Sequence, residues 1–272
     1  MCDLLEFLQV RSCDGLLPWA AQLEASRCYS KSLAEVEAMA LENTLLPIRY
    51  QRNLAMLSVA EQQRLFCSCV AVVGCGGLGG YVLEELARLG VGRIIAIDPD
   101  SFQEHNLNRQ LLSSVNNLGQ SKVSAAIERL ALTNPAVTVD AYQEAFGSLN
   151  GERLLQGADV VVDCLDSVAT RLELAEVCTV LGSPLVHGAI AGWYGHVCTV
   201  LPGALSFDRL YGHNASDKGT EKVMGNPSFT PAVIASLEVA EVCKLLLHKG
   251  RILDDHALNI DLLDMELTEI PL

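Results

Sequence analysis

The sequence predicts an α/β fold, in which a mostly parallel sheet carries helices on both faces, with antiparallel strands near the C-terminus and a helical extension at the N-terminus. From residue 69 onward, short apolar runs alternate with segments of helical periodicity, the order that is typical of parallel sheets. A turn with five glycines at 74–80 joins the first apolar run to a helix. The tail, residues 257–272, alternates roughly as strands and indicates a closing hairpin. Together these observations predict a Rossmann-like domain.

The glycine turn lies inside a strand–turn–helix–strand unit, whose strands are Val70–Val73 and Ile94–Ile97. Without Cβ atoms the turn can be tight, and a nucleotide phosphate can approach its backbone N–H groups. The following helix directs the positive end of its dipole toward that phosphate. Asp98 follows Gly79 by nineteen residues, at the place where an acidic side chain holds a ribose hydroxyl. The unit therefore predicts a nucleotide site, but it does not identify the nucleotide.

Composition narrows the class of protein. The 272 residues suffice for one large α/β domain with appendages or for two small domains, and half of them are apolar. A formal net charge of −14 argues against nucleic acid as the main partner, because phosphate backbones bind cationic surfaces. Ten cysteines include no CxxC pair, so neither a zinc ribbon nor a redox dithiol is indicated. The chain shows no signal peptide and no run of about 18 apolar residues, so we expect a cytoplasmic protein without a membrane segment.

We divide the chain into a helical extension, residues 1–46, and a nucleotide-binding domain, residues 47–272. The extension shows two helical patterns, the second opened by a capping box of Ser32 and Glu35. We interpret it as packing on the main domain or on a second subunit. A Gly-, Ser- and Asn-rich connection at 202–230 is long enough to be a functional cover or a partner-binding segment. The remaining elements are expected as strands at 137–141, 158–162, 185–189 and 196–201, and as helices at 58–66, 122–132, 168–181 and 232–248.

Polar residues follow the predicted strands at the edge where ligands bind in such sheets. Residues 106–110, which read NLNRQ, lie beyond the second strand. Lys122 lies in the first turn of a helix, where a cation opposes the helix dipole and so suggests a negative ligand nearby. Asp163 and Asp166 end the fourth strand. Asp166 either caps the helix that begins at Val168 or serves magnesium or phosphate, and one residue can do both.

Six motifs between residues 49 and 267 resemble the ATP-dependent activating enzymes of ubiquitin-fold proteins, in their HesA/MoeB/ThiF branch. The motifs are RYQRN at 49–53, GCGGLGG at 74–80, DPD at 98–100, NLNRQ at 106–110, GQSK at 119–122 and DCLD at 163–166. Their order and approximate spacing are those of the family. Six motifs in register are far more specific than a single glycine turn.

The resemblance implies adenylation of the C-terminal glycine of a small ubiquitin-fold sulfur carrier that ends in Gly-Gly, as in thiamine or molybdenum-cofactor biosynthesis. It implies an ATP site that comprises Gly74, Gly76, Gly77, Gly79, Asp98, Asp100, Asn106, Arg109, Gln110 and Lys122. It implies catalytic roles for Arg52, Arg109, Lys122 and Asp166, with Asp166 near magnesium. Arg52 would reach the site from a neighbouring subunit, so we expect a homodimer. The attacking carboxylate is already ionised, so cations around the triphosphate matter more than a general base.

Departures from the family pattern sharpen these expectations. Relatives often carry two CxxC pairs for a structural zinc, but residues 203–210 contain no cysteine, and we expect no zinc. The segment 202–231 also lacks the cysteine that thioester-forming relatives use. We therefore expect the reaction to stop at an acyl-adenylate, which passes to a separate sulfur donor. Ser167 stands where relatives commonly have Asn, which weakens the assignment of Asp166.

Three other functions compete with adenylation of a sulfur carrier. An NAD-dependent oxidoreductase fits the glycine turn and Asp98 equally, but it does not explain Arg52, Arg109 and Lys122. A non-catalytic scaffold with the same fold would have no reason to keep these cations and Asp166. An enzyme that adenylates a tRNA-borne carboxylate is disfavoured by the acidic net charge.

Overall fold

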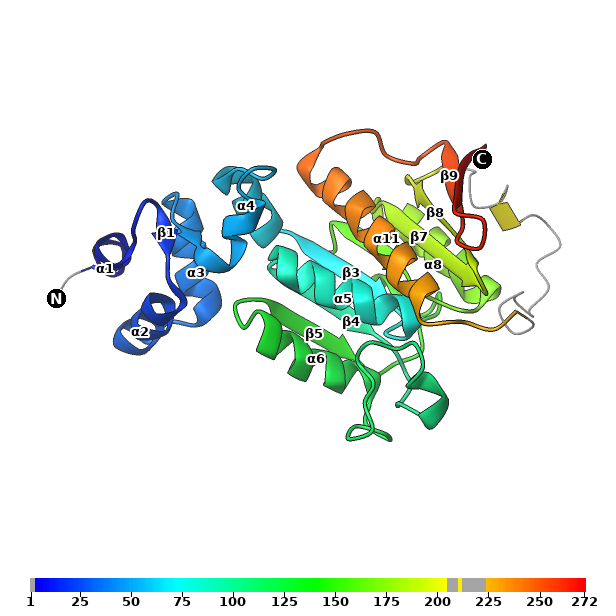
Figure 1. Ribbon diagram of the computed structural model, residues 1–272, viewed down its shortest axis with the longest axis horizontal. Coiled ribbons are helices and arrows are strands. Elements are labelled where there is room, and N and C mark those ends of the chain that lie inside the picture. Colours follow the sequence, from blue (N-terminus) through cyan, green and yellow to red (C-terminus); the bar gives the residue numbers. More distant parts are fainter. Residues whose placement is uncertain (1–2, 205–209, 212–223) are drawn as a thin grey trace.

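A computed structural model describes residues 3–204, 210–211 and 224–272. Its core is an eight-stranded sheet in the order β10-β9-β8-β7-β6-β3-β4-β5 (Figure 1). The strands are β3 (Cys69–Val73), β4 (Arg93–Ile97), β5 (Thr138–Tyr142), β6 (Val160–Asp163), β7 (Leu185–Ala191), β8 (Tyr194–Val200), β9 (His256–Asp261) and β10 (Glu266–Pro271). Strands β3 to β7 pair in parallel, whereas β7 to β10 pair antiparallel. The predicted fold and the closing hairpin are confirmed.

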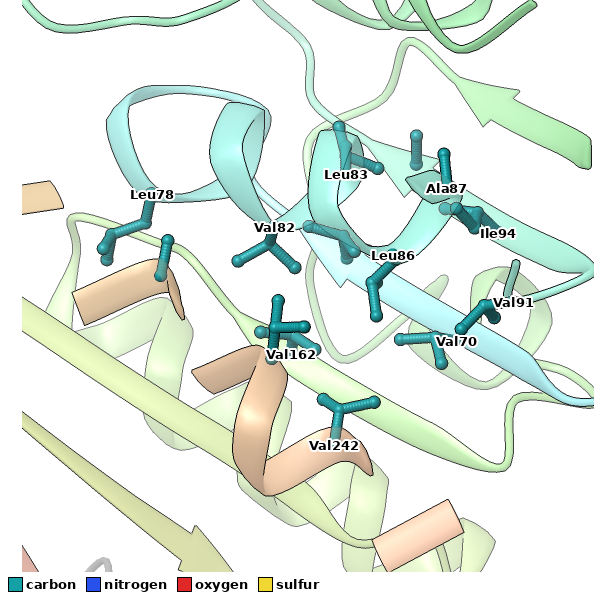
Figure 2. Packing of buried hydrophobic residues seen from close by; sticks show 14 of the residues in the cluster. Val70, Leu78, Val82, Leu83, Leu86, Ala87, Val91, Ile94, Val162 and Val242 are labelled. Carbon is teal, nitrogen blue, oxygen red and sulfur yellow. The ribbon is translucent and has the colours of Figure 1, made fainter. Parts of the chain in front are cut away.

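Helices cover both faces of the sheet. Side chains alternate between the two faces along each strand, so each face presents apolar side chains that the helices bury. On one face, α5 (Gly77–Leu89), α6 (Lys122–Thr133) and α11 (Phe229–Leu247) share one apolar core. In Figure 2, Val82 and Leu86 of α5 lie over the sheet, close to Val162 of β6. On the other face, α7 (Gly151–Leu154) and α8 (Val168–Leu181) share a second core. Burial on both faces explains why β3, β4 and β6 are nearly continuous apolar runs.

The predicted boundaries of most elements agree with the structure to within about two residues. The largest shift is at α11, which begins at Phe229 rather than at Ala232. Pro231 lies in its first turn, where a missing N–H leaves no helical hydrogen bond unmade. The connection at 202–230, expected to be a cover, lies largely outside the described residues. No helix in the described part of the chain is both long and apolar enough to cross a membrane.

The N-terminal extension contains three helices within its described residues, one more than predicted. They are α1 (Leu4–Arg11), α2 (Trp19–Tyr29) and α3 (Leu33–Glu42), and a short parallel pair, β1 (Leu16–Leu17) with β2 (Leu46–Pro47), closes the unit. Helix α2 escaped prediction because its buried face consists of Ala21, Gln22 and Ala25, which give no apolar periodicity. The capping box of Ser32 and Glu35 is confirmed.

A buried polar cluster joins the extension to the larger unit of the same chain. We call it the Arg49 cluster; its members are Gln22, Glu37, Arg49, Tyr50 and Asn134. Arg49 and Tyr50 lie on the 3-10 helix η1 (Ile48–Asn53), which precedes α4 (Val59–Phe66). Arg49 pairs with Glu37 and donates to Gln22 Oε1 at 2.7 Å, and the Tyr50 hydroxyl donates to Glu37 Oε1 at 2.7 Å. Asn134, from the end of α6, donates to the Tyr50 hydroxyl at 2.7 Å.

Candidate functional site

A pocket of about 600 Å³ opens at the carboxyl ends of β3, β4 and β6. The chain runs from β3 outward through β4 to β5 and then returns to β6 on the other side of β3. Ligands bind at such switch points, because the two adjoining connections leave in opposite directions and open a crevice. The predicted residues that line the pocket are Gly74, Gly76, Gly77, Asp98, Asp100, Arg109, Gln110, Lys122 and Asp166.

The glycine turn contains two kinds of glycine. Gly76 and Gly77 line the pocket at the start of α5, and among the described residues no side chain caps this helix start, so its first-turn N–H groups and dipole face the pocket. Gly74 has φ +97° and packs against the Cys164 carbonyl, which would lie 2.5 Å from an added Cβ. Gly79, predicted to line the phosphates, is not among the described residues that line the pocket. A Cβ there would lie 1.8 Å from the Gly74 carbonyl oxygen, so Gly79 is required for close packing of the turn.

Asp98 fastens the glycine turn to the end of β4. The Cys75 N–H donates to its Oδ2 at 2.7 Å, and the Asp100 N–H donates to its Oδ1 at 2.8 Å. Lys122 Nζ lies 2.8 Å from Asp100 Oδ2 and 3.5 Å from Asp98 Oδ2. The lysine charge, which looked misplaced in the first turn of its helix, is thus compensated by two carboxylates of the chain itself. The position of Lys122 in its helix therefore does not by itself require the negative ligand that the sequence suggested.

The segment 106–110 contributes two of its three predicted site residues. Arg109 lines the pocket and donates to the His105 carbonyl at 3.0 Å. Gln110 is 7% exposed and lies beside Gly76, and its Oε1 is buried with no hydrogen-bond partner among the described residues. Asn106, predicted to line the same pocket, lines instead a smaller adjoining pocket together with Asp100 and Lys122. Its Oδ1 accepts from the Gln103 N–H at 2.9 Å, which caps the short 3-10 helix η2 (Glu104–Asn106).

Asp166 lies exposed at the pocket wall, just before α8. The interpretation of Asp166 as the helix cap is wrong, because Ser167 occupies the cap position and its hydroxyl accepts from the Thr170 N–H at 3.4 Å. The Asp166 carboxylate is therefore not needed for capping. Sequence reasoning missed that the next residue carries the same capping chemistry.

Arg52 is exposed on η1 and is not among the described residues that line the pocket. Helix η1 packs near Gly90, since the Tyr50 hydroxyl would lie 2.5 Å from a Cβ at that glycine. Gly90 caps the C-terminal end of α5, whereas the pocket lies at its N-terminal end. The 13 residues of α5 span about 20 Å. Arg52 thus lies far from the pocket of its own chain.

The structure adds pocket residues that sequence reasoning did not single out. Ala145 and Phe146 follow β5 at the same edge of the sheet and add an apolar wall. Their place after the third strand was a signal that could have found them. Arg171 of α8 also lines the pocket, although it is only 4% exposed. Cys164 lies there too, and burial raises the pKa of its thiol well above the usual value, so it is no ready nucleophile.

Residues 50–272 match the ThiF family. The chain belongs to this family. It is 34% identical over 230 residues to the SAMP-activating enzyme E1 of Haloferax volcanii, which covers 82% of this chain and 84% of that protein. It is 35% identical over 234 residues to the sulfur carrier protein adenylyltransferase of Thermus thermophilus, with 82% and 86% covered. It is 31% identical over 206 residues to the sulfur carrier protein ThiS adenylyltransferase of Escherichia coli, with 73% and 81% covered.

Solved structures share the fold. Crystal structures of PaaA and of MccB from Escherichia coli with ATP superpose with TM-scores of 0.70 and 0.66. The matches cover 82% of this chain in both cases, and 72% and 71% of those chains. Sequence identities of 20% and 22% make these likenesses of architecture. The family resemblance carried by the six motifs and the predicted fold class are confirmed.

Proposed function

We propose that this protein uses ATP to adenylate the C-terminal glycine carboxylate of a small ubiquitin-fold sulfur carrier protein, giving an acyl-adenylate and pyrophosphate. The observation that carries the proposal is that Arg109, Lys122 and Asp166 meet the glycine turn around one pocket. The chain belongs to the ThiF family, and relatives named for sulfur carrier adenylation match it over most of its length. A nicotinamide cofactor does not explain the Arg109 cation at the pocket.

The pocket suits ATP in size and chemistry. Gly76 and Gly77 offer backbone N–H groups to phosphates at the start of α5. Asp98 would hold the ribose, since each of its oxygens accepts one backbone hydrogen bond and keeps a second lone pair. Gln110 also lines the pocket beside Gly76, where its side-chain amide can donate to a phosphate oxygen. Asp166 would hold magnesium, which neutralises phosphate charge when it is bound.

The proposed reaction is an in-line displacement at the α-phosphorus. An oxygen of the carrier carboxylate forms a bond to phosphorus while the bond to pyrophosphate breaks. Negative charge accumulates on the phosphate oxygens, and Arg109 and Lys122 stabilise it. Lys122 can turn from Asp100, whose side chain is 65% exposed and readily hydrated, toward a phosphate without leaving Asp98. A general base is unnecessary because the carboxylate is ionised.

We propose that the reaction ends at the acyl-adenylate and that a separate sulfur donor takes over. Residues 202–231 contain no cysteine, and burial raises the pKa values of the Cys75 and Cys164 thiols near the pocket. We also propose a homodimer in which Arg52 of one subunit completes the site of the other, because Arg52 lies far from its own pocket. We also place the reaction in the cytoplasm, where the described cysteines, all of them free, would stay reduced.

The test is ATP–pyrophosphate exchange with a carrier protein that ends in Gly-Gly. The wild type should exchange, and Lys122→Ala and Arg109→Ala should lose at least about 100-fold of the rate. Lys31→Ala, which removes an exposed lysine of the extension, is the matched control and should exchange like the wild type. Tight NAD(H) binding without ATP binding would instead establish an oxidoreductase, and binding of neither nucleotide would indicate a scaffold.

A mixing experiment tests the role of Arg52. Arg52→Ala and Lys122→Ala subunits are each expected to be inactive alone. Mixed dimers should regain part of the exchange activity, because one of their two sites would combine an intact Arg52 with an intact Lys122. If mixing restores nothing although mixed dimers form, Arg52 does not act across an interface.

A further inference from the structure

A chain of three buried polar groups and one half-buried tyrosine lies under the pocket, on the α8 face of the sheet. We call it the His187 chain; it comprises Asp163 at the end of β6, His187 of β7, Tyr211 and Arg171 of α8. Asp163 and His187 are fully buried, and Arg171 is 4% exposed. His187 Nδ1 lies 2.8 Å from Asp163 Oδ2, and His187 Nε2 lies 2.8 Å from the Tyr211 hydroxyl. Arg171 Nη1 donates to that hydroxyl at 2.8 Å.

Asp163 and Arg171, at the two ends of the His187 chain, orient its hydrogen bonds, and His196 Nε2 lies 3.2 Å from the same His187 Nε2. Burial lowers the pKa of His187, so its ring is neutral and carries one N–H. That N–H is at Nδ1, since Asp163 can only accept, which leaves Nε2 as an acceptor. Burial also raises the pKa of Tyr211, so its hydroxyl keeps its proton and donates to Nε2. The bonds thus run from the Arg171 cation through Tyr211 and His187 to the Asp163 carboxylate.

Asp163 and Arg171, at the two ends of the His187 chain, both form hydrogen bonds with Leu165 of the pocket wall. Asp163 Oδ1 accepts from the Leu165 N–H at 3.0 Å, and Arg171 donates from Nε to the Leu165 carbonyl at 3.1 Å. Leu165 is therefore held at both its N–H and its carbonyl group. Asp166 follows Leu165 directly, and the Cys164 carbonyl before it packs against Gly74 of the glycine turn. The position of Asp166 relative to the glycine turn thus depends on the His187 chain.

We propose that Tyr211 and His187 are positioning residues for the adenylation reaction, acting through Arg171 and Leu165 to hold Asp166 at the triphosphate. This inference rests on the proposed function. It assigns a task to polar side chains that would otherwise be costly to bury in an apolar core. It also links Tyr211, which lies in the connection at 202–230, to the phosphate end of the pocket.

The test compares two variants that each remove one buried hydroxyl. Tyr211→Phe deletes the hydroxyl of the His187 chain, and Thr199→Val deletes a hydroxyl that donates to Glu241 at 2.8 Å on the other face of the sheet. Both variants should lose comparable thermal stability. Only Tyr211→Phe should lower kcat for exchange, by about tenfold, with KM for ATP changed less than twofold, because misplacement of Asp166 is felt most in the transition state.

A second variant tests whether the chain acts as a unit. His187→Leu removes both ring nitrogens and can no longer accept from Tyr211, so it should lower kcat to a similar extent. Tyr211→Phe added to His187→Leu should then lower kcat by less than a further twofold, since groups of one network are not additive. Wild-type exchange together with an unchanged kcat in both folded single variants would overturn this inference alone. Absence of exchange in the wild type would overturn the proposed function and this inference with it.

Discussion

At the two ends of α5 the molecule buries charge in two different ways. Near Gly90, the Arg49 cluster pairs Arg49 with Glu37 and satisfies Glu37 further through the Tyr50 hydroxyl. Near Gly76, Lys122 pairs with Asp98 and Asp100, but these groups line a pocket of about 600 Å³. Side chains of the protein surround the first group of charges, whereas the second group borders an open pocket.

The comparison shows that a buried ion pair is not by itself the mark of a functional site. Burial raises the pKa of Glu37 and favours its neutral form, and Arg49 and Tyr50 oppose this. Such a cluster orders the junction between the extension and the larger unit. At the pocket, an orphan acceptor on Gln110 and exposed carboxylates on Asp100 and Asp166 accompany the ion pair. An open pocket bordered by exposed carboxylates is what distinguishes the ligand site, because Gln62 beside Gly90 also has a buried Oε1 with no partner among the described residues.

The largest expected effect is on the Arg49 cluster. Glu37→Ala should lower the free energy of unfolding by about 3–5 kcal/mol, because it leaves a largely buried Arg49 cation without its carboxylate. Denaturant unfolding measures this change. The control is Glu24→Ala, which breaks the exposed pair with Arg11 and should cost less than about 1 kcal/mol. Equal losses in the two variants would contradict the role given to the cluster.

Lys122→Ala, at the pocket, should lower activity strongly and stability only slightly, unlike Glu37→Ala. Its loss of exchange, at least about 100-fold, corresponds to about 2.7 kcal/mol of transition-state stabilisation. Its free energy of unfolding should fall by about 1 kcal/mol or less, because water in the pocket and the N–H groups of Cys75 and Asp100 still serve Asp98. A stability loss as large as that of Glu37→Ala would remove the distinction between the two ends of α5.

The next prediction concerns Glu238 of α11, a buried acid that lacks, among the described residues, a paired cation such as the one Glu37 has in Arg49. It is fully buried, and neither carboxylate oxygen has a hydrogen-bond partner among the described residues. Burial raises its pKa well above the usual value, so the unfolded state gains by ionising as the pH rises above 4.5. Wild-type stability should therefore fall relative to Glu238→Gln, by at most about 1.4 kcal/mol per pH unit between pH 6 and 8. The exposed Glu176→Gln serves as control, and parallel pH profiles for wild type and Glu238→Gln would contradict the prediction.

The smallest effect concerns His196, whose Nε2 lies 3.2 Å from Nε2 of His187. Burial lowers the pKa of His196 from 6.5 to about 3, so between these values only the unfolded state takes up the proton. Its contribution to stability is complete above pH 6.5 and is lost as the pH falls. Between pH 7 and 5.5 the wild type should lose about 1 kcal/mol more than His196→Gln in denaturant unfolding. An identical loss in both proteins would mean that His196 does not resist protonation when folded.

Sequence reasoning succeeded where the signal is local. The strands β3 and β4, the glycine turn, the capping box at Ser32 and the final hairpin all depend on residues a few positions apart. It failed where one local pattern is compatible with two different structural roles. Asp166 and Ser167 are both good helix caps, and only the backbone geometry selects Ser167. Asn106 resembled a ligand-binding residue, but it serves the backbone of its own turn.

By itself the sequence determined the fold class, the family and the place of the nucleotide pocket, because periodicity, glycine spacing and motif order are properties of neighbouring residues. Only the tertiary structure decided which polar groups meet. Lys122 with Asp98, Arg49 with Glu37, and the His187 chain all join side chains at least a dozen residues apart. Such pairs form because the packed sheet and helices bring them together, and the cost of burying an unpaired polar group then selects their partners.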